Sequence, residues 1–300
     1  MEEKIRKEVK KIIKEKVKKI LKEKKKKGRG RPKKYKEWEI IYLMIIKTIE
    51  KLSYRKLEKR GKDYLKKAPN YTTIQKRIKE MDEELLKKII EEIGREIEKK
   101  LKGRKRIMVI ADGTGFGYDG KWYIKEKIYI KGKIIKIKEK EVKSHVKVEL
   151  IIGIKAGKRY LKAIEVALPY SDERKMLKKL LNNHRLKPSS RRKVIFLADS
   201  FYGKDNLLLE KLISTFDLVI VKIKDTPRQP VISKIRQKVQ QMYLKNKHIY
   251  KKRFHIEAYI GNVKSSFGSW INVKTFACAK NFVLVNFLLF SILQLLSLSS

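Results

Sequence analysis

The chain has 300 residues, and its 79 Lys and Arg residues exceed its 33 Asp and Glu residues by 46, which gives a formal net charge of +46. Hydrophobic residues make up 42% of the chain, enough at this length to bury one or two cores, so a wholly disordered protein is excluded. Such an excess of Lys and Arg predicts nucleic acid as the partner, because each cation that neutralises a phosphate releases a condensed counterion.

Residues 1–27 are predicted to form a charged amphipathic helix. Apolar residues recur at spacings of three and four between residues 5 and 21, which places them on one stripe among lysines. This stripe is suited to docking on, or pairing with, another chain. The segment has no unbroken apolar stretch, so it is not a secretory signal.

Residues 28–35 are predicted to form a basic linker. Its centre, Gly28-Arg29-Gly30-Arg31-Pro32, resembles an AT-hook, in which arginines enter a narrow minor groove. By that resemblance Arg29 and Arg31 bind DNA. The alternative is a flexible basic linker that touches phosphates only, and the sequence leaves both open.

Residues 36–102 are predicted to form a small all-α, helix-turn-helix-like DNA-binding domain. Helices are expected at 37–49, from Ser53 onward and at 68–81, and a charged amphipathic helix is expected at 82–102.

The helix at 68–81 is the candidate recognition helix, with Thr72 or Thr73 as its N-cap. Its outward side chains suit phosphates and base edges in a major groove: Gln75, Lys76 and Arg77. The alternative is a solvated basic face on a structural helix.

Residues 103–300 are predicted to form an α/β domain. Apolar and β-branched runs predict a meander of antiparallel strands at 106–112, 121–130, 133–140 and 145–154. Beyond them, strands at 193–199 and 217–223 alternate with helices at 171–184 and 205–214, so the sheet becomes mixed. Residues 225–247 read as a basic excursion before the last helices.

The C-terminal segment 282–298 is long enough to approach a membrane span. Two amides, Asn286 and Gln294, interrupt it and favour a helix buried against the sheet over a membrane anchor. Trp270 is expected in the core, and the alternative is that it faces DNA. The single cysteine, Cys278, excludes an internal disulfide and a thiolate zinc site, which fits a reducing, cytoplasmic location. We expect the protein to associate with the nucleoid and not with a membrane.

Two carboxylates follow apolar strands. Asp112 ends VIAD before GTGFG, and Asp199 ends IFLAD before SFYG. If these strands are neighbours, both carboxylates emerge at one edge of the sheet as hard oxygen ligands for Mg²⁺ or Mn²⁺. Nearby glycines leave backbone room for a bulky anionic substrate: residues 113, 115, 117 and 203. The alternative is that each Asp simply begins a turn or caps a helix.

A third carboxylate belongs to a spaced pattern. Tyr250, Arg253, Glu257 and Lys264 stand as Y-x2-R-x3-E-x6-K, which on a helix places the last three on one side. The alternative is a surface ladder of ion pairs.

With these motifs, residues 106–298 resemble the DDE transposases of prokaryotic insertion sequences that carry this signature. The segments at 112–116 and 198–203 match as well. The resemblance implies a ribonuclease H-like mixed sheet flanked by helices, with Asp112, Asp199 and Glu257 as a catalytic triad that binds two divalent ions. It also implies DNA contacts by Tyr250, Arg253 and Lys264, and a homodimer in the active complex.

The function predicted from the sequence is a DNA transposase. It would bind the ends of an insertion sequence and transfer a 3′-hydroxyl to target DNA by metal-dependent phosphoryl transfer. Two alternatives remain: a nuclease of the same fold that joins no ends, and a non-catalytic DNA-binding relative.

Overall fold

The structure is a computed structural model that describes residues 2–23, 34–102, 106–130, 133–183, 193–225 and 230–298. Within these ranges, the side chains of residues 122–130, 133–140 and 143 are not described. Arg29 and Arg31 of the AT-hook-like linker lie outside the described residues, so that prediction stays open.

The N-terminal region is helical, as predicted. Its five helices are α1 (Glu3–Glu23), α2 (Glu37–Glu50), α3 (Tyr54–Tyr64), α4 (Tyr71–Lys79) and α5 (Glu83–Lys100). Ser53 caps α3 and Asp82 caps α5 with side-chain oxygens. The predicted cap of α4 is wrong: Asn70, not Thr72 or Thr73, accepts the hydrogen bond from the Thr73 amide at 2.9 Å. Asn70 is extended and precedes the first helical residue, which is the position that caps require.

The apolar stripe of α1 is buried inside the chain. Val9, Ile13, Val17 and Ile20 are 0 to 3% exposed, and α1 packs on α2 and α5. The alternative that this stripe pairs with another chain is therefore wrong, because the four residues already belong to the core of this chain.

The sheet has six strands: β1 (Arg106–Ile130), β2 (Lys133–Lys155), β3 (Lys158–Ala167), β4 (Lys193–Ala198), β5 (Leu218–Val221) and β6 (Trp270–Ile271). The strand order is β3-β2-β1-β4-β5, and β6 pairs separately with β1. The pairs β3·β2 and β2·β1 are antiparallel, whereas β1·β4 and β4·β5 are parallel. This mixed sheet confirms the predicted ribonuclease H-like fold class.

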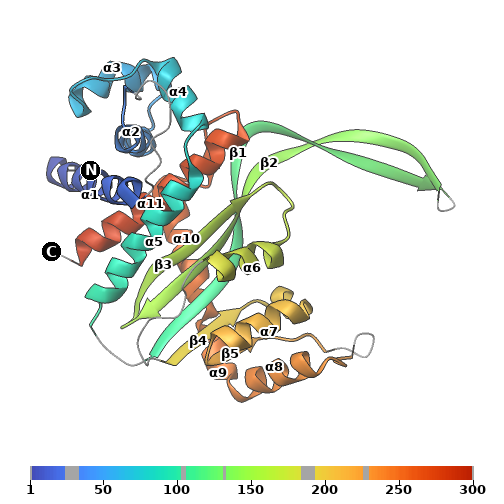
Figure 1. Cartoon of the computed structure of the whole chain (residues 1–300). Helices are drawn as coiled ribbons and strands as arrows, with labels where there is room; N and C mark the ends of the chain where they lie inside the picture. Colours follow the sequence, from blue (N-terminus) through green and yellow to red (C-terminus); the bar gives the residue numbers. More distant parts are fainter. Residues whose placement is uncertain are drawn as a thin grey trace.

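The predicted meander of four short strands is wrong. Residues 106–112 and 121–130 belong to the single strand β1, and residues 133–140 and 145–154 belong to β2. The two strands stay paired from Met108↔Ile154 to Ile130↔Lys133. Their far ends extend away from the rest of the molecule as a two-stranded ribbon (Figure 1).

Helices cover both faces of the sheet (Figure 1). Three helices that follow β3 belong with one face: α6 (Glu173–Asn183), α7 (Asn206–Thr215) and α8 (Lys234–Lys245). The other face meets α5, α10 (Phe254–Phe267) and α11 (Phe276–Ser297). Alternation along β1 explains the division, because Val109 and Ala111 pack with the first group and Ile110 with the second. The described residues also include the short helical turns η1 (Ser200–Lys204), α9 (Lys247–Tyr250) and η2 (Lys251–Arg253).

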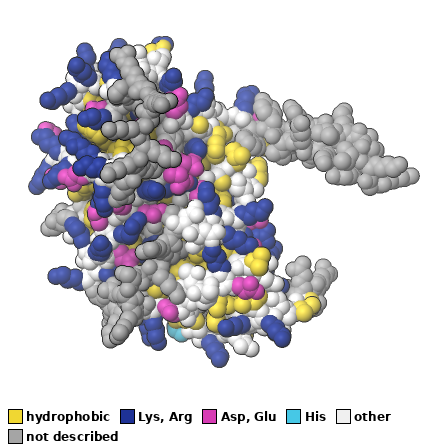
Figure 2. Space-filling view, in the orientation of Figure 1, with side chains coloured by type: hydrophobic (Ala, Val, Ile, Leu, Met, Phe, Trp, Pro, Cys, Tyr) yellow, Lys and Arg dark blue, Asp and Glu magenta, His cyan; other side chains and the backbone are white. Residues whose placement is uncertain are grey.

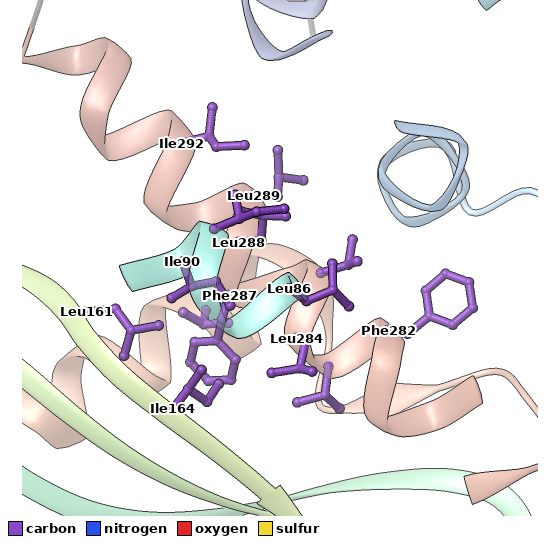
Figure 3. Packing of buried hydrophobic residues seen from close by; sticks show 14 of the residues in the cluster. Leu86, Ile90, Leu161, Ile164, Phe282, Leu284, Phe287, Leu288, Leu289 and Ile292 are labelled. Carbon is purple, nitrogen blue, oxygen red and sulfur yellow. The ribbon is translucent and has the colours of Figure 1, made fainter. Parts of the chain in front are cut away.

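The long apolar helix α11 is a core helix. Its length and composition would allow it to cross a membrane, but 72% of its most apolar window is buried within the protein. Figure 3 shows its Phe287 beside Ile164 of β3, with Leu86 and Ile90 of α5 in the same cluster. The prediction of a buried helix is confirmed.

The close approach of α5 to the sheet depends on Gly94. A Cβ atom there would lie 2.0 Å from the carbonyl oxygen of Leu161 on β3. The apolar core therefore runs without a break from the N-terminal helices to the sheet, across the domain boundary predicted at residues 102 and 103. The predicted division into 1–27, 28–35, 36–102 and 103–300 remains a prediction.

Two buried asparagines on α11 give a test of this core. Asn286 is 1% exposed, and within the described residues both polar atoms of its amide lack a hydrogen-bond partner. Asn281 is also buried but donates to the Ile78 carbonyl at 2.8 Å. An unpaired buried polar group costs about 1–3 kcal/mol, so Asn286→Leu is expected to raise the free energy of unfolding by about that amount.

Asn281→Leu is the matched control, because it makes the same exchange on the same helix but loses a hydrogen bond. It is expected to gain about 1 kcal/mol less than Asn286→Leu in urea denaturation. Equal effects of the two substitutions would contradict this description of the core.

Candidate functional site

Asp112 on β1 and Asp199, the residue directly after β4, occupy equivalent positions beyond the parallel pairing of the two strands. The last parallel pair between β1 and β4 is Ile110↔Leu197, and each aspartate stands two residues beyond its member of that pair. The prediction that the strand ends at Asp112 is wrong, because β1 continues past Asp112, which pairs with Leu150 of β2. The predicted convergence of the two carboxylates nevertheless follows from the parallel pairing.

Arg253 brings the third carboxylate to the same place. Its guanidinium donates through Nη1 to Asp112 Oδ2 at 3.1 Å and through Nη2 to Glu257 Oε1 at 2.5 Å. The four-residue spacing of Arg253 and Glu257 places both on one side of the turn that leads into α10. One cation thus joins two carboxylates that are 145 residues apart in the sequence.

Burial and like charge shape the electrostatics of this site. Burial raises the pKa of Asp112 to about 6; Arg253 opposes the rise, and the neighbouring carboxylates of Asp199 and Glu173 add to it. Burial is the main cause that raises the pKa of Tyr250 to about 12, and the negative charge of Asp199 is the second. Tyr250 therefore stays protonated near neutral pH and presents a hydroxyl donor beside Asp199.

Lys264 lies farther from the carboxylates. It stands seven residues after Glu257, about two helical turns along α10, with its ammonium 5.2 Å from the centre of the Phe116 ring. Burial lowers the pKa of Lys264. Three of the four signature residues, Tyr250, Arg253 and Glu257, are therefore grouped around Asp112 and Asp199. The fourth, Lys264, lies farther along α10, next to Phe116.

Two further carboxylates lie close by and were not predicted. Glu173 at the start of α6 pairs with Lys147 and fills the space beside Gly113. Glu149 is completely buried on β2, directly across from Gly113, and accepts a hydrogen bond from the Tyr202 hydroxyl at 2.7 Å. The signal for Glu149 was a charged residue inside the apolar run VELIIGI.

The predicted room beside the β1 glycines is filled by side chains. A Cβ at Gly113 would lie 2.6 Å from Glu173 Oε1, and one at Gly117 would lie 2.3 Å from the indole of Trp270. Trp270 is 51% exposed, so its predicted place in the core is wrong. The indole N–H donates to Asp119 at 2.6 Å, which holds the ring over the backbone of β1.

The predicted recognition helix presents only part of its basic face. Gln75 and Lys76 on α4 are exposed. Arg77 instead binds Glu37 at 2.9 Å and the carbonyl of Tyr35 at 3.0 Å. Its side chain is 11% exposed, so it joins α4 to the start of α2.

A strongly basic surface leads to the carboxylates. No Asp or Glu occurs between Asp225 and Glu257. Six lysines over α8, α9 and η2 are exposed and form no ion pair within the described part of the chain: Lys234, Lys238, Lys245, Lys247, Lys251 and Lys252. We call these six residues the α8–η2 lysine surface. Figure 2 shows that Lys and Arg side chains are also spread over the rest of the visible face.

The donor set suits hard divalent cations. Among the described residues, no three His, Cys, Asp or Glu side chains are already arranged around a common metal position. Asp112, Asp199 and Glu257 do offer carboxylate oxygens, which Mg²⁺ and Mn²⁺ prefer. Burial is the main cause of the raised pKa of Asp112, and the charges of Asp199 and Glu173 add to it. A cation held by these carboxylates would favour their ionised form, so the residues fit such an ion.

The raised pKa of Asp112 gives a prediction about stability in the absence of divalent ions. Between about pH 4 and 6 the folded state keeps a proton on Asp112 that the unfolded state releases, so stability falls as pH rises through this window. Asp112→Asn lacks this loss. Its free energy of unfolding relative to wild type is therefore expected to increase by about 1–3 kcal/mol from pH 4 to pH 6 and then level off.

Denaturant unfolding of both proteins in EDTA at several pH values measures this difference. A difference that does not change with pH would show that Asp112 has an ordinary pKa.

No family model matches the chain. An uncharacterized protein of Aquifex aeolicus (strain VF5) is 35% identical over 271 residues, which are 90% of this chain and 81% of that protein. A crystal structure of the Mos1 strand transfer complex covers 92% of this chain and 81% of its own, at 13% identity and a TM-score of 0.30, which is too low to support an argument about fold or function. The identity and coverage place the chain in one family with the Aquifex aeolicus protein.

Proposed function

We propose that the protein is a DNA transposase that binds the ends of an insertion sequence, cleaves a strand and transfers its 3′-hydroxyl to target DNA. The observation that carries the proposal is the grouping of Asp112, Asp199 and Glu257 around Arg253 on a ribonuclease H-like sheet. The net charge of +46 supports a polyanionic substrate.

The carboxylates of Asp112, Asp199 and Glu257 would hold two Mg²⁺ or Mn²⁺ ions. Bound there, divalent ions supply an activated hydroxyl nucleophile and neutralise charge on the leaving oxygen. The chain itself supplies the ligands and the partly buried setting, in which opposite charges attract more strongly than in bulk water.

Arg253 and Tyr250 would bind the substrate next to these ligands. A guanidinium grips phosphate oxygens in the same bidentate manner as carboxylate oxygens. The guanidinium of Arg253, which now binds Asp112 and Glu257, would offer the same pair of donors to a phosphate group of DNA. The Tyr250 hydroxyl and the Lys264 ammonium would each donate to further phosphate oxygens.

The helical region would recognise the element ends. Gln75 and Lys76 are exposed on α4 and suit a DNA groove, while Arg77 would act by holding α4 in place. Arg29 and Arg31 would add minor-groove contacts. Pairing of two ends implies a homodimer in the active complex, acting in the cytoplasm on nucleoid DNA.

Strand cleavage and joining on labelled duplexes test this proposal. The duplexes carry the DNA that flanks the gene and are incubated with Mg²⁺ or Mn²⁺. Wild type is expected to give discrete 3′-hydroxyl ends and joined products, and EDTA is expected to abolish both. Asp112→Asn is expected to lose at least a hundredfold in cleavage, while it keeps its affinity for DNA.

The products distinguish the alternatives. Cleavage without joining would favour a nuclease of the same fold. DNA binding without cleavage would favour a non-catalytic relative. If Asp112→Asn lost DNA binding and cleavage together, the separation of metal-binding and DNA-binding residues would be contradicted.

The α8–η2 lysine surface gives a separate prediction about DNA binding. Replacement of Lys245, Lys247 and Lys251 by Gln is expected to reduce the slope of log K against log salt concentration by about 2 to 3, because each phosphate contact contributes about 0.9. The measurement is a fluorescence-anisotropy titration with duplex DNA at several salt concentrations.

The matched control replaces Lys4, Lys11 and Lys18 on α1, which are also exposed, and removes the same charge. We expect the slope to stay near that of wild type in this control. An equal loss in both variants would mean that DNA binds to the general positive charge and not to this surface.

A further inference from the structure

Tyr202 and Glu149 form a buried hydrogen bond behind the carboxylates. Both side chains are completely buried, and the tyrosine hydroxyl donates to Glu149 Oε1 at 2.7 Å. Burial raises the pKa of Glu149 well above its ordinary value. A polar pair in such surroundings is expensive to desolvate, so its presence needs a reason.

The hydrogen bond spans the strand that carries Asp112. Tyr202 belongs to η1, the turn that begins directly after Asp199, and its amide donates to the Asp199 carbonyl at 3.2 Å. Glu149 lies on β2 and is paired with Gly113, the neighbour of Asp112. Since β1 lies between β4 and β2, the Tyr202 hydroxyl ties the turn after Asp199 to the strand on the far side of Asp112.

The surroundings leave the turn little freedom at its other end. A Cβ at Gly203 would lie 2.7 Å from the Ile223 side chain, so the backbone of the turn is packed directly on the segment that follows β5. Asp205 closes the turn by capping α7 and pairing with Lys178 at 2.7 Å. These contacts hold the turn against α6 and β5, whereas the Tyr202 hydrogen bond holds it against β2.

We propose that Tyr202 and Glu149 are positioning residues that fix Asp199 relative to Asp112 and thereby set the spacing of the divalent-ion ligands. The inference rests on the metal site of the proposed function. Neither residue contacts the ions or the DNA; they act through the backbone of the turn. Partners that orient ligands in this indirect way typically contribute about 10- to 100-fold to metal affinity.

Titration of the full chain with Mn²⁺, followed by electron paramagnetic resonance of the free ion, tests this role without DNA or activity. Tyr202→Phe removes the hydroxyl and keeps the ring. Its Mn²⁺ affinity is expected to fall about 10- to 100-fold. Glu149→Gln removes the carboxylate but keeps an oxygen that accepts from Tyr202, so its affinity is expected to stay near that of wild type.

A double variant separates positioning from simple stability. Tyr202→Phe alone leaves a buried carboxyl unpaired and is expected to lower the melting temperature. Tyr202→Phe with Glu149→Leu replaces both partners by apolar groups, which restores much of the lost stability. The double variant is still expected to bind Mn²⁺ as weakly as Tyr202→Phe, because the tie to β2 stays broken.

Four results would overturn the inference. If the double variant regained both stability and Mn²⁺ affinity, the pair would be merely structural. If Glu149→Gln lost affinity, Glu149 would act as a charge or a ligand. If Tyr202→Phe kept full affinity while Asp112→Asn lost it, the inference would fail and the proposed function would stand. A wild type that binds no Mn²⁺ would overturn the inference together with the metal site.

Discussion

The candidate site depends on one interaction: the guanidinium of Arg253 binds the carboxylates of Asp112 and Glu257 in a partly buried part of a very basic protein. Asp112 and Asp199 emerge side by side because β1 and β4 are parallel, and Glu257 joins them because Arg253 binds it and Asp112 at once. Burial raises the pKa of Asp112, and repulsion from the neighbouring carboxylates of Asp199 and Glu173 adds to the rise. Ionising these carboxylates without bound cations lowers the stability of the folded state, so the site is well suited to bind cations. A functional site commonly lowers the stability of its own fold in this way.

The fold serves this grouping through the position of β1. This strand is antiparallel to β2 on one side and parallel to β4 on the other, so it brings together the turn after β4 and the hairpin-forming β2. Helices α5 and α11 fix the sheet from one face, and the close contact at Gly94 holds α5 against β3. The N-terminal helices and the sheet therefore share one core, and a DNA end bound by α4 would be held in a fixed relation to the carboxylates.

Patterns of local sequence predicted most of the helices and the alternation of strands and helices between residues 171 and 223, and they singled out the three carboxylates. They missed α8, which lies in the segment that was read as a basic excursion, and the short strand β6. They failed where distant side chains decide the structure. The glycines after Asp112 were expected to leave room for a substrate, yet the side chains of Glu173 and Trp270 occupy the space beside Gly113 and Gly117. Arg77 was predicted to contact DNA, but its guanidinium forms an ion pair with Glu37. No local pattern signals that Tyr202 reaches Glu149, since the two are brought together only by the pairing of the sheet.

The central claim is that Asp112, Asp199 and Glu257 together hold the divalent ions. Iron-directed cleavage of the polypeptide tests it directly: Fe²⁺ is bound in place of Mg²⁺, and ascorbate with peroxide then releases hydroxyl radicals that cut the chain close to the ion. The account predicts fragments that end near residues 112, 199 and 257, all suppressed by excess Mg²⁺. Cuts at only one of these positions, or at none of them, would contradict it.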